Sequence, residues 1–249
     1  MISFSNFWDY FPCYVDGHLH TVRFDVQVEH LDLVTRARYP HIFELVISAM
    51  IVDTQGFPAS VELDRISRLE ESFNPHPFNM RLIGGITGSG MVRYAFAVDS
   101  VDVNGMTDAL LGEEFADMKH STHLFRNNNF EYYYDLLLPN TQERAWIANR
   151  DICADFKAKG EAFKTSRNIE FYLNFATEQF VPLVLQLLIA LGADEFRQEV
   201  TPDGEFRVRM TIAGIPTFAW ISNITNGILA ALEGTDGYFD GWNTNVHKH

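Results

Sequence analysis

The chain has 249 residues, of which 47% are hydrophobic and 14% aromatic, enough apolar side chains for two cores of ordinary size. It carries 19 Lys and Arg against 33 Asp and Glu, and this net charge of −14 argues against direct binding of nucleic acid. No segment approaches the roughly 20 apolar residues of a membrane span. The chain has only two cysteines, Cys13 and Cys153, so we expect no disulfide framework. A reducing compartment is therefore expected, which means a cytoplasmic location.

The first half of the chain has the pattern of strands separated by turns. Aromatic and β-branched residues flank Asp16-Gly17, which predicts a hairpin of strands 8–15 and 19–28. Further along we expect a strand at 41–52, a helix after Pro58, and a second hairpin of strands 80–86 and 91–98. A helix from Thr107 should follow, with Leu111, Phe115 and Met118 facing inward. A strand at 130–138 is expected to close the unit.

The second half begins at a predicted boundary after Pro139. Asn140 and Glu143 have the spacing of two residues that cap a helix start, and Gly160 suits its end. We then expect a strand at 169–175, a helix from about 179, a hairpin around Pro202-Asp203-Gly204, and a helix from Phe218 that ends at Gly234. The sequence therefore predicts an α+β protein with domains 1–139 and 140–249, each an antiparallel sheet with helices on one face.

One glycine-rich loop, residues 84–90, invites comparison with phosphate-binding loops. A phosphate site requires such a loop to lead into a helix, whose free amides hold the anion. A strand beginning at Met91 follows here instead, so a hairpin turn is the better prediction.

Residues with catalytic or metal-binding potential are scattered. His18 and His20, and His120 and His123, are spaced as pairs but have no companion ligands in a known pattern. Cys13 has no local histidine that would activate it, and Cys153 lies on the apolar face of its predicted helix. We therefore expect no enzyme activity, no metal and no cofactor.

The segment after the last predicted helix is rich in aromatic residues and contains an Asp-Gly turn. It consists of Tyr238, Phe239, Asp240, Gly241, Trp242, Asn243 and Thr244. This sequence resembles the closing motif of the regulator of ribonuclease E activity B family, and the resemblance extends back to Asn140. Residues 8–139 resemble an uncharacterised bacterial domain family that is often found before it.

The resemblance implies a ferredoxin-like fold for the second domain and a protein that binds ribonuclease E and lowers its activity. The candidate partner-binding residues are Tyr238, Phe239, Asp240, Gly241, Trp242 and Thr244. We expect Trp242 to be at least half buried, with Tyr238 and Phe239 packed beside it. Asp240 and the neighbouring acidic surface are expected to face a basic partner. Single-domain members end in an acidic tail, which this chain lacks, so the partner can differ from ribonuclease E.

Two other functions remain open at this point. An acidic protein without catalytic residues also suits a binder of another basic protein, such as an immunity protein that neutralises a nuclease toxin. A hydrolase with its site between the two domains is the third alternative, because sequence does not show which carboxylates meet in space.

Overall fold

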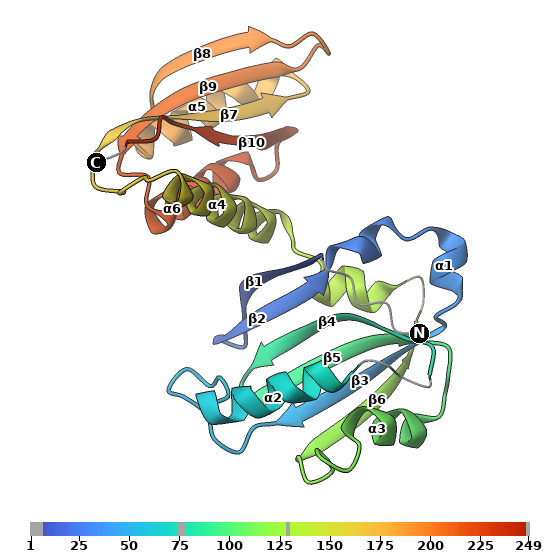
Figure 1. Ribbon diagram of the computed structural model, residues 1–249. Helices are drawn as coiled ribbons and strands as arrows, with labels where there is room; N and C mark the ends of the chain where they lie inside the picture. The colour runs from blue at the N-terminus through green and yellow to red at the C-terminus, as the bar shows by residue number, and fades with distance from the viewer. Residues whose placement is uncertain (1–6, 74–77, 128–129, 248–249) are drawn as a thin grey trace. The chain divides into compact units, whose positions relative to one another are not determined.

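The computed structural model describes residues 7–73, 78–127 and 130–247, and the chain divides into two compact units, Met1–Pro139 and Asn140–His249 (Figure 1). Both are α+β units, each built on one antiparallel sheet, which confirms the predicted fold class.

The first unit contains a six-stranded sheet with the order β1-β2-β4-β5-β3-β6. Its strands are β1 (Trp8–Val15), β2 (His18–Asp25), β3 (His41–Ser48), β4 (Met80–Gly88), β5 (Met91–Val98) and β6 (His120–Arg126). The helical segments are η1 (Val26–His30), α1 (Leu33–Ala37), α2 (Ser60–Ser72), α3 (Val103–Leu111) and η2 (Tyr133–Leu137). Apolar residues of α2 and α3 pack on one face of the sheet in a single core, and η2 lies against the other face behind β2 and β4 (Figure 1).

Both predicted hairpins of this unit are confirmed. Asp16 and Gly17 have φ angles of 51° and 79°, which a tight turn between two strands requires. The glycine-rich segment is part of β4 and its turn to β5, as predicted. At Gly85 a side chain would come within 2.8 Å of the Arg93 carbonyl oxygen, so the glycine allows close backbone approach rather than anion binding.

The predicted strand at 130–138 is wrong. Its central part is a π-helical turn, and Phe130, Tyr133 and Leu137 are all buried. These residues recur at three and four positions, which is helical spacing, whereas their aromatic composition favours a strand. The Tyr133 hydroxyl donates to the Asp25 carbonyl oxygen at 2.9 Å, which fixes the turn against the sheet.

Two further expectations for this unit need correction. Helix α3 begins at Val103, not at Thr107, because Asp102 caps it by accepting from the Gly105 amide at 2.9 Å. It ends at Leu111, so Phe115 and Met118 are buried as expected but lie beyond the helix. Strand β6 was not predicted at all. It is an edge strand whose side chains are mostly exposed, so its sequence lacks the apolar alternation of a half-buried strand.

The second unit has a four-stranded sheet with the order β10-β7-β9-β8. Its elements are α4 (Thr141–Ala158), β7 (Arg167–Phe175), η3 (Glu178–Phe180), α5 (Val181–Ala190), β8 (Asp194–Val200), β9 (Phe206–Gly214), α6 (Phe218–Leu232) and β10 (Gly237–Asn243). After α4, the succession strand, helix, strand, strand, helix, strand with this order is the ferredoxin-like arrangement. Residues of α4, α5 and α6 share one core with the inner face of the sheet, and within residues 140–247 no helix covers the other face (Figure 1).

Candidate functional site

Strand β10 contains most of the candidate binding residues and divides them between two faces. It pairs with β7, and a bulge between Phe239 and Gly241 shifts the register by one residue. Phe239 and Trp242 therefore both point into the helix-covered core, whereas Tyr238 and Asp240 lie on the opposite face. The expected packing of Phe239 beside Trp242 is confirmed and that of Tyr238 is wrong, because Tyr238 is 47% exposed on the side without helices.

Trp242 is 6% exposed, which confirms the expectation that it is buried. Its Nε1–H donates to Asn149 Oδ1 at 2.8 Å, and the Asn149 amide donates to Thr225 Oγ1 at 3.2 Å. Its ring meets Phe156 edge to face at 5.6 Å. The indole consequently joins β10 to α4 and α6, and it is not available to contact a partner directly.

We call the side of this sheet that faces away from the helices the open face. Its central side chains form a polar layer: Glu170, Tyr172, Asn174, Arg207, Arg209, Tyr238 and Asp240. Strand alternation produces this layer, because Ile169, Phe171 and Leu173 between them are fully buried on the other side. The open face is therefore rich in Tyr and Arg, the residue types that dominate binding energy at protein interfaces.

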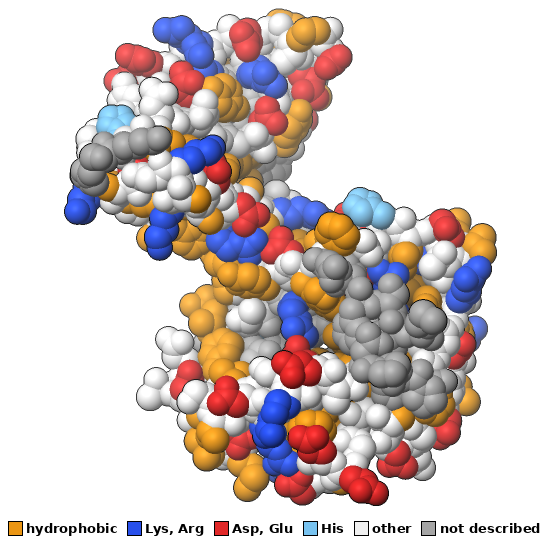
Figure 2. Space-filling view, viewed as in Figure 1, with side chains coloured by type: hydrophobic (Ala, Val, Ile, Leu, Met, Phe, Trp, Pro, Cys, Tyr) orange, Lys and Arg blue, Asp and Glu red, His pale blue; other side chains and the backbone are white. Residues whose placement is uncertain are grey.

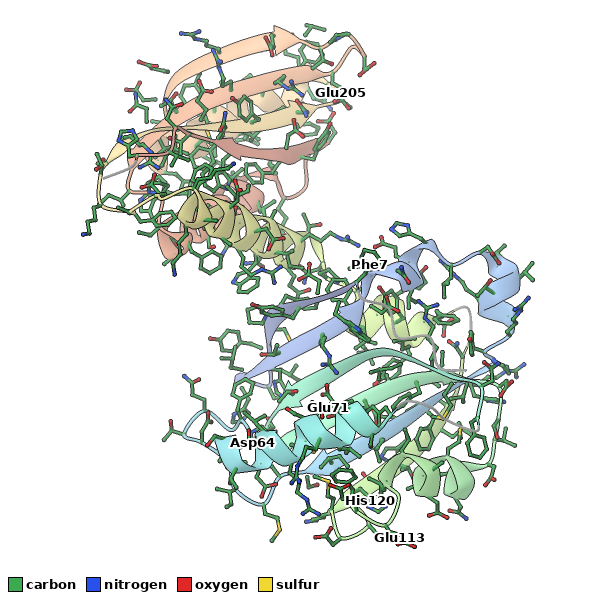
Figure 3. The ribbon with its side chains drawn as sticks, in the orientation of Figure 1. Phe7, Asp64, Glu71, Glu113, His120 and Glu205 are labelled. Carbon is green, nitrogen blue, oxygen red and sulfur yellow. The ribbon has the colours of Figure 1, made fainter. Side chains whose placement is uncertain are left out.

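The open face has two hydrogen-bonded groups. In the first, Arg207 donates to Asn174 Oδ1 at 2.9 Å and to Asp240 Oδ2 at 3.1 Å. Nearby, the Tyr238 hydroxyl donates to Glu205 Oε2 at 2.9 Å, and this hydrogen bond raises the tyrosine pKa. Figure 3 shows Glu205 at the start of β9, at one end of the sheet. Asp240 therefore already has a cationic partner within its own domain.

The second group centres on Glu170. Its carboxylate accepts from the Tyr172 hydroxyl at 2.6 Å and pairs with Arg209 at 3.5 Å. The hydrogen bond from the tyrosine to Glu170 is the main reason that the Tyr172 pKa is raised. These contacts hold the exposed side chains in fixed positions, which reduces the entropy lost on binding a partner.

Thr244, just beyond β10, has a structural contact of its own. Its hydroxyl donates to the Asn168 carbonyl oxygen at 3.1 Å and accepts from Arg167 Nε at 3.2 Å. Arg167 in turn forms a buried ion pair with Glu161 at 2.8 Å. Gly241 supplies the bulge, with a φ of 117° that other residues rarely adopt.

A cleft of about 620 Å³ lies on the helix side of β10. It is lined by Thr141, Gln142, Asn226, Leu229, Ala230, Leu232, Glu233, Gly237, Tyr238 and Phe239. Glu233 is the only acidic or basic residue of this lining, so no pair of such side chains meets in the cleft. Tyr238 borders both this cleft and the open face.

The histidine and cysteine residues considered as metal ligands or nucleophiles lie in strands or in the core. Within the described ranges, no three His, Cys, Asp or Glu side chains come together as metal ligands would. His120 and His123 lie on edge strand β6, where His120 Nδ1 bonds the Met118 carbonyl oxygen at 2.9 Å. Cys153 is buried, as predicted, and burial raises its thiol pKa to about 11. None of the described helices combines the length and the apolar character needed to cross a bilayer.

Sequence reasoning missed Asn149, Thr225, Arg207 and Glu205 as neighbours of the motif. Asn149 stands on the apolar side of an amphipathic helix, and a buried amide of this kind signals a hydrogen-bonded partner elsewhere in the fold. Arg207 follows a turn and gives no such signal, since surface arginines are common.

Comparison with known proteins assigns a family to each half of the chain. Residues 146–244 match the family model of regulator of ribonuclease activity B, and residues 6–138 match that of a family of unknown function, DUF695. Both resemblances expected from the sequence are thereby confirmed. No curated protein matches the chain.

Two solved structures show likeness at low similarity. One is an unknown protein from Galdieria sulphuraria, 13% identical, covering 82% of this chain and 99% of that one, with a TM-score of 0.23. The other is described as a glycine cleavage system transcriptional repressor, 8% identical, covering 82% and 98%, with a TM-score of 0.24. At these values neither supports an inference, so the identification rests on the family models. The chain belongs to the DUF695 family through residues 6–138, and its second unit matches the regulators of ribonuclease activity B.

Proposed function

We propose that this protein is a non-catalytic regulator that binds a ribonuclease, with ribonuclease E as the target, and lowers its activity. The observation that carries the proposal is the family match over 146–244, which covers the whole ferredoxin-like sheet. The open face of that sheet supports it, since an uncovered layer of Tyr and Arg side chains suits protein binding.

Tyr238 is the residue that we propose as the centre of the contact. It is 47% exposed, and its hydroxyl is already oriented by Glu205. A tyrosine offers a large contact area with few rotatable bonds, so its burial by a partner costs little side-chain entropy. Phe239 and Trp242 act indirectly, because they fix β10 from the core side.

Charge contributes to the choice of partner. The chain carries a net charge of −14, which attracts a basic protein over the distance of a Debye length. Asp240 is bound to Arg207, so a basic side chain of the partner has to compete with that contact. We therefore assign the acidic surface a role in the rate of association and Tyr238 a role in affinity.

The test is a titration of purified ribonuclease E with the full chain, with both binding and RNA cleavage measured. Wild type is expected to bind and to slow cleavage. Tyr238→Ala is expected to weaken binding by about 2 kcal/mol or more, roughly 30-fold in Kd, as aromatic hot spots do.

The matched control is Leu183→Ala on α5, which removes an exposed apolar side chain from the helix side of the same domain. It is expected to bind like wild type. Absence of binding by the wild-type chain would refute ribonuclease E as the target. Binding to a different basic protein, lost again in Tyr238→Ala, would then favour the second function considered above.

A further inference from the structure

The first unit exposes a group of apolar side chains at one end of its sheet. We call this group the apolar end, and it consists of Met50, Ile51, Val52, Val61 and Leu63. Met50 is 84% exposed, and the others are between 42% and 61% exposed. The first three belong to the loop that follows β3, and the last two to the first turn of α2. Five such side chains within 14 residues are unusual for a surface that faces only water.

The loop that carries Met50 is held in place by backbone hydrogen bonds. The Ala49 amide donates to the Gly90 carbonyl oxygen at 2.8 Å, and the Ala59 amide donates to the Ile51 carbonyl oxygen at 2.9 Å. Val52 and Pro58 form an isolated β-bridge. The apolar side chains are therefore presented by a fixed backbone, as a binding surface requires.

One further exposed apolar residue continues this surface toward β1. Tyr14 is 75% exposed, whereas the next residue, Val15, points to the other face of the sheet. Tyr14 precedes the β1–β2 turn, and His20 of β2 meets Ser89 of the β4–β5 turn at 3.2 Å. The β4–β5 turn in turn contacts the loop at Gly90. Figure 2 shows hydrophobic side chains gathered on the side of this unit where these turns lie.

The apolar end is poor in charge within an acidic unit. Residues 1–139 contain 9 basic and 19 acidic side chains, a formal charge of −10. The only charged residues in segment 49–63 are Asp53 and Glu62. The Asp53 carboxylate accepts from the amides of Gln55 and Phe57 at 2.8 and 2.9 Å, so it is turned toward its own loop.

The exposed area fits a dimer interface. With Tyr14, the apolar end offers six exposed apolar side chains as the centre of an interface, in which each partner of a standard complex contributes roughly 800 Å². An anionic membrane would repel a unit of charge −10, and two acidic copies meet most easily where charge is sparse. A two-fold axis brings the same patch of both copies together, so the surface needs to complement only itself.

We propose that the first unit is a dimerisation module, and that two copies of this chain associate through the apolar end. The proposal gives the DUF695 unit a role that is separate from ribonuclease binding. It does not depend on the proposed function of the second unit, because its test involves this chain alone.

The test is sedimentation velocity of the full chain at micromolar concentrations. Wild type is expected to sediment as a dimer, with twice the 28.5 kDa mass of the monomer. Met50→Asp is expected to sediment as a monomer, because each copy would bring a charge into an apolar contact. The control Leu33→Asp places the same charge on an equally exposed leucine of α1, away from the apolar end, and is expected to remain dimeric.

A cross-linking variant provides a second measurement. In a Cys13→Ser background, Met50→Cys is expected to form a disulfide-linked dimer under mild oxidation if the axis passes near the loop, and Leu33→Cys is not. Circular dichroism establishes that each variant is folded. A monomeric wild type, or a folded Met50→Asp that still sediments as a dimer, would overturn the proposal. A monomer whose apolar end binds a different protein would overturn it as well.

Discussion

Trp242 shows how a residue singled out by a motif can serve the fold rather than the partner. Its indole fills the space between β10, α4 and α6, and its N–H satisfies the buried amide oxygen of Asn149. Asn149 is 2% exposed, so in the folded protein the indole, and not solvent, satisfies its amide oxygen. Trp242 therefore connects the sheet to the helices in this domain.

Removal of this indole is expected to destabilise the second unit. Trp242→Ala should lower its free energy of unfolding by about 3–5 kcal/mol, because it leaves a cavity and an unsatisfied amide. Trp242→Phe should cost less, since it keeps most of the packing. Urea denaturation followed by circular dichroism measures both, with Tyr238→Ala as the exposed control. If Trp242→Ala unfolded at the same urea concentration as wild type, the structural role assigned to Trp242 would be wrong.

Glu161 is a second residue whose contacts lie far from it in sequence. Burial acts to raise its pKa, but the His247 and Phe163 amides and the Arg167 guanidinium outweigh burial and lower the pKa below its ordinary value of 4.5. A lowered pKa in the folded state means that the ionised carboxylate stabilises the fold. This contribution is complete above about pH 4.5 and is lost as the pH falls through the folded-state pKa.

We expect Glu161→Gln to lower stability by about 3–5 kcal/mol at pH 7, because Arg167 would remain as a buried, unpaired charge. The variant should also lose stability less steeply than wild type between pH 5 and pH 3, a window set by the ordinary carboxyl pKa. Denaturation curves at several pH values test this, and Glu199→Gln on the exposed edge strand serves as the control. If the free energy of unfolding changed with pH in the same way for wild type and Glu161→Gln, the stabilising role of the ionised Glu161 would be contradicted.

At the scale of elements, short sequence patterns identified the helices and turns that are stabilised by contacts between residues close in sequence. The reciprocal cap of Asn140 and Glu143 was predicted and is confirmed, with distances of 3.0 and 2.8 Å. The segment 130–138 was misread because its aromatic composition and its helical spacing point to different structures, and contacts with the sheet decided between them. Edge strand β6 gave no local signal, since its backbone pairing with β3 is its main contact.

The cap offers a test at this scale. Asn140→Ala is expected to lower the stability of the second unit by about 1 kcal/mol, because the Glu143 amide loses its acceptor. Gln142→Ala in the same turn has no capping role and is expected to change stability by less than about 0.5 kcal/mol. Thermal unfolding of both variants compares them directly. Equal effects would show that the cap contributes nothing specific.

At the scale of the whole molecule, the chain has two sheets and two separate cores. Each unit has its own cluster of buried apolar side chains, and the family models end and begin on either side of Pro139. This independence would allow one unit to bind a ribonuclease while the other associates with a second copy.

We propose the boundary at Pro139-Asn140 and expect each fragment, 1–139 and 140–249, to fold alone. Limited proteolysis should release stable pieces of these sizes, and each expressed fragment should unfold cooperatively. A fragment that stays unfolded until the other is added would show that the units depend on each other for stability.

The sequence by itself determined the class of the fold, the hairpin turns, the helix cap and the kinship of both halves, because each depends on neighbouring residues or on a short motif. Only the tertiary structure decided which motif residues are buried and which are exposed on the open face. The bulge in β10 sends Trp242 inward, toward an amide 93 positions earlier, and leaves Tyr238 outside. The apolar end likewise emerged only when loops distant in sequence met at one end of a sheet. Contacts of this kind are set by packing across the whole domain, which no local pattern encodes.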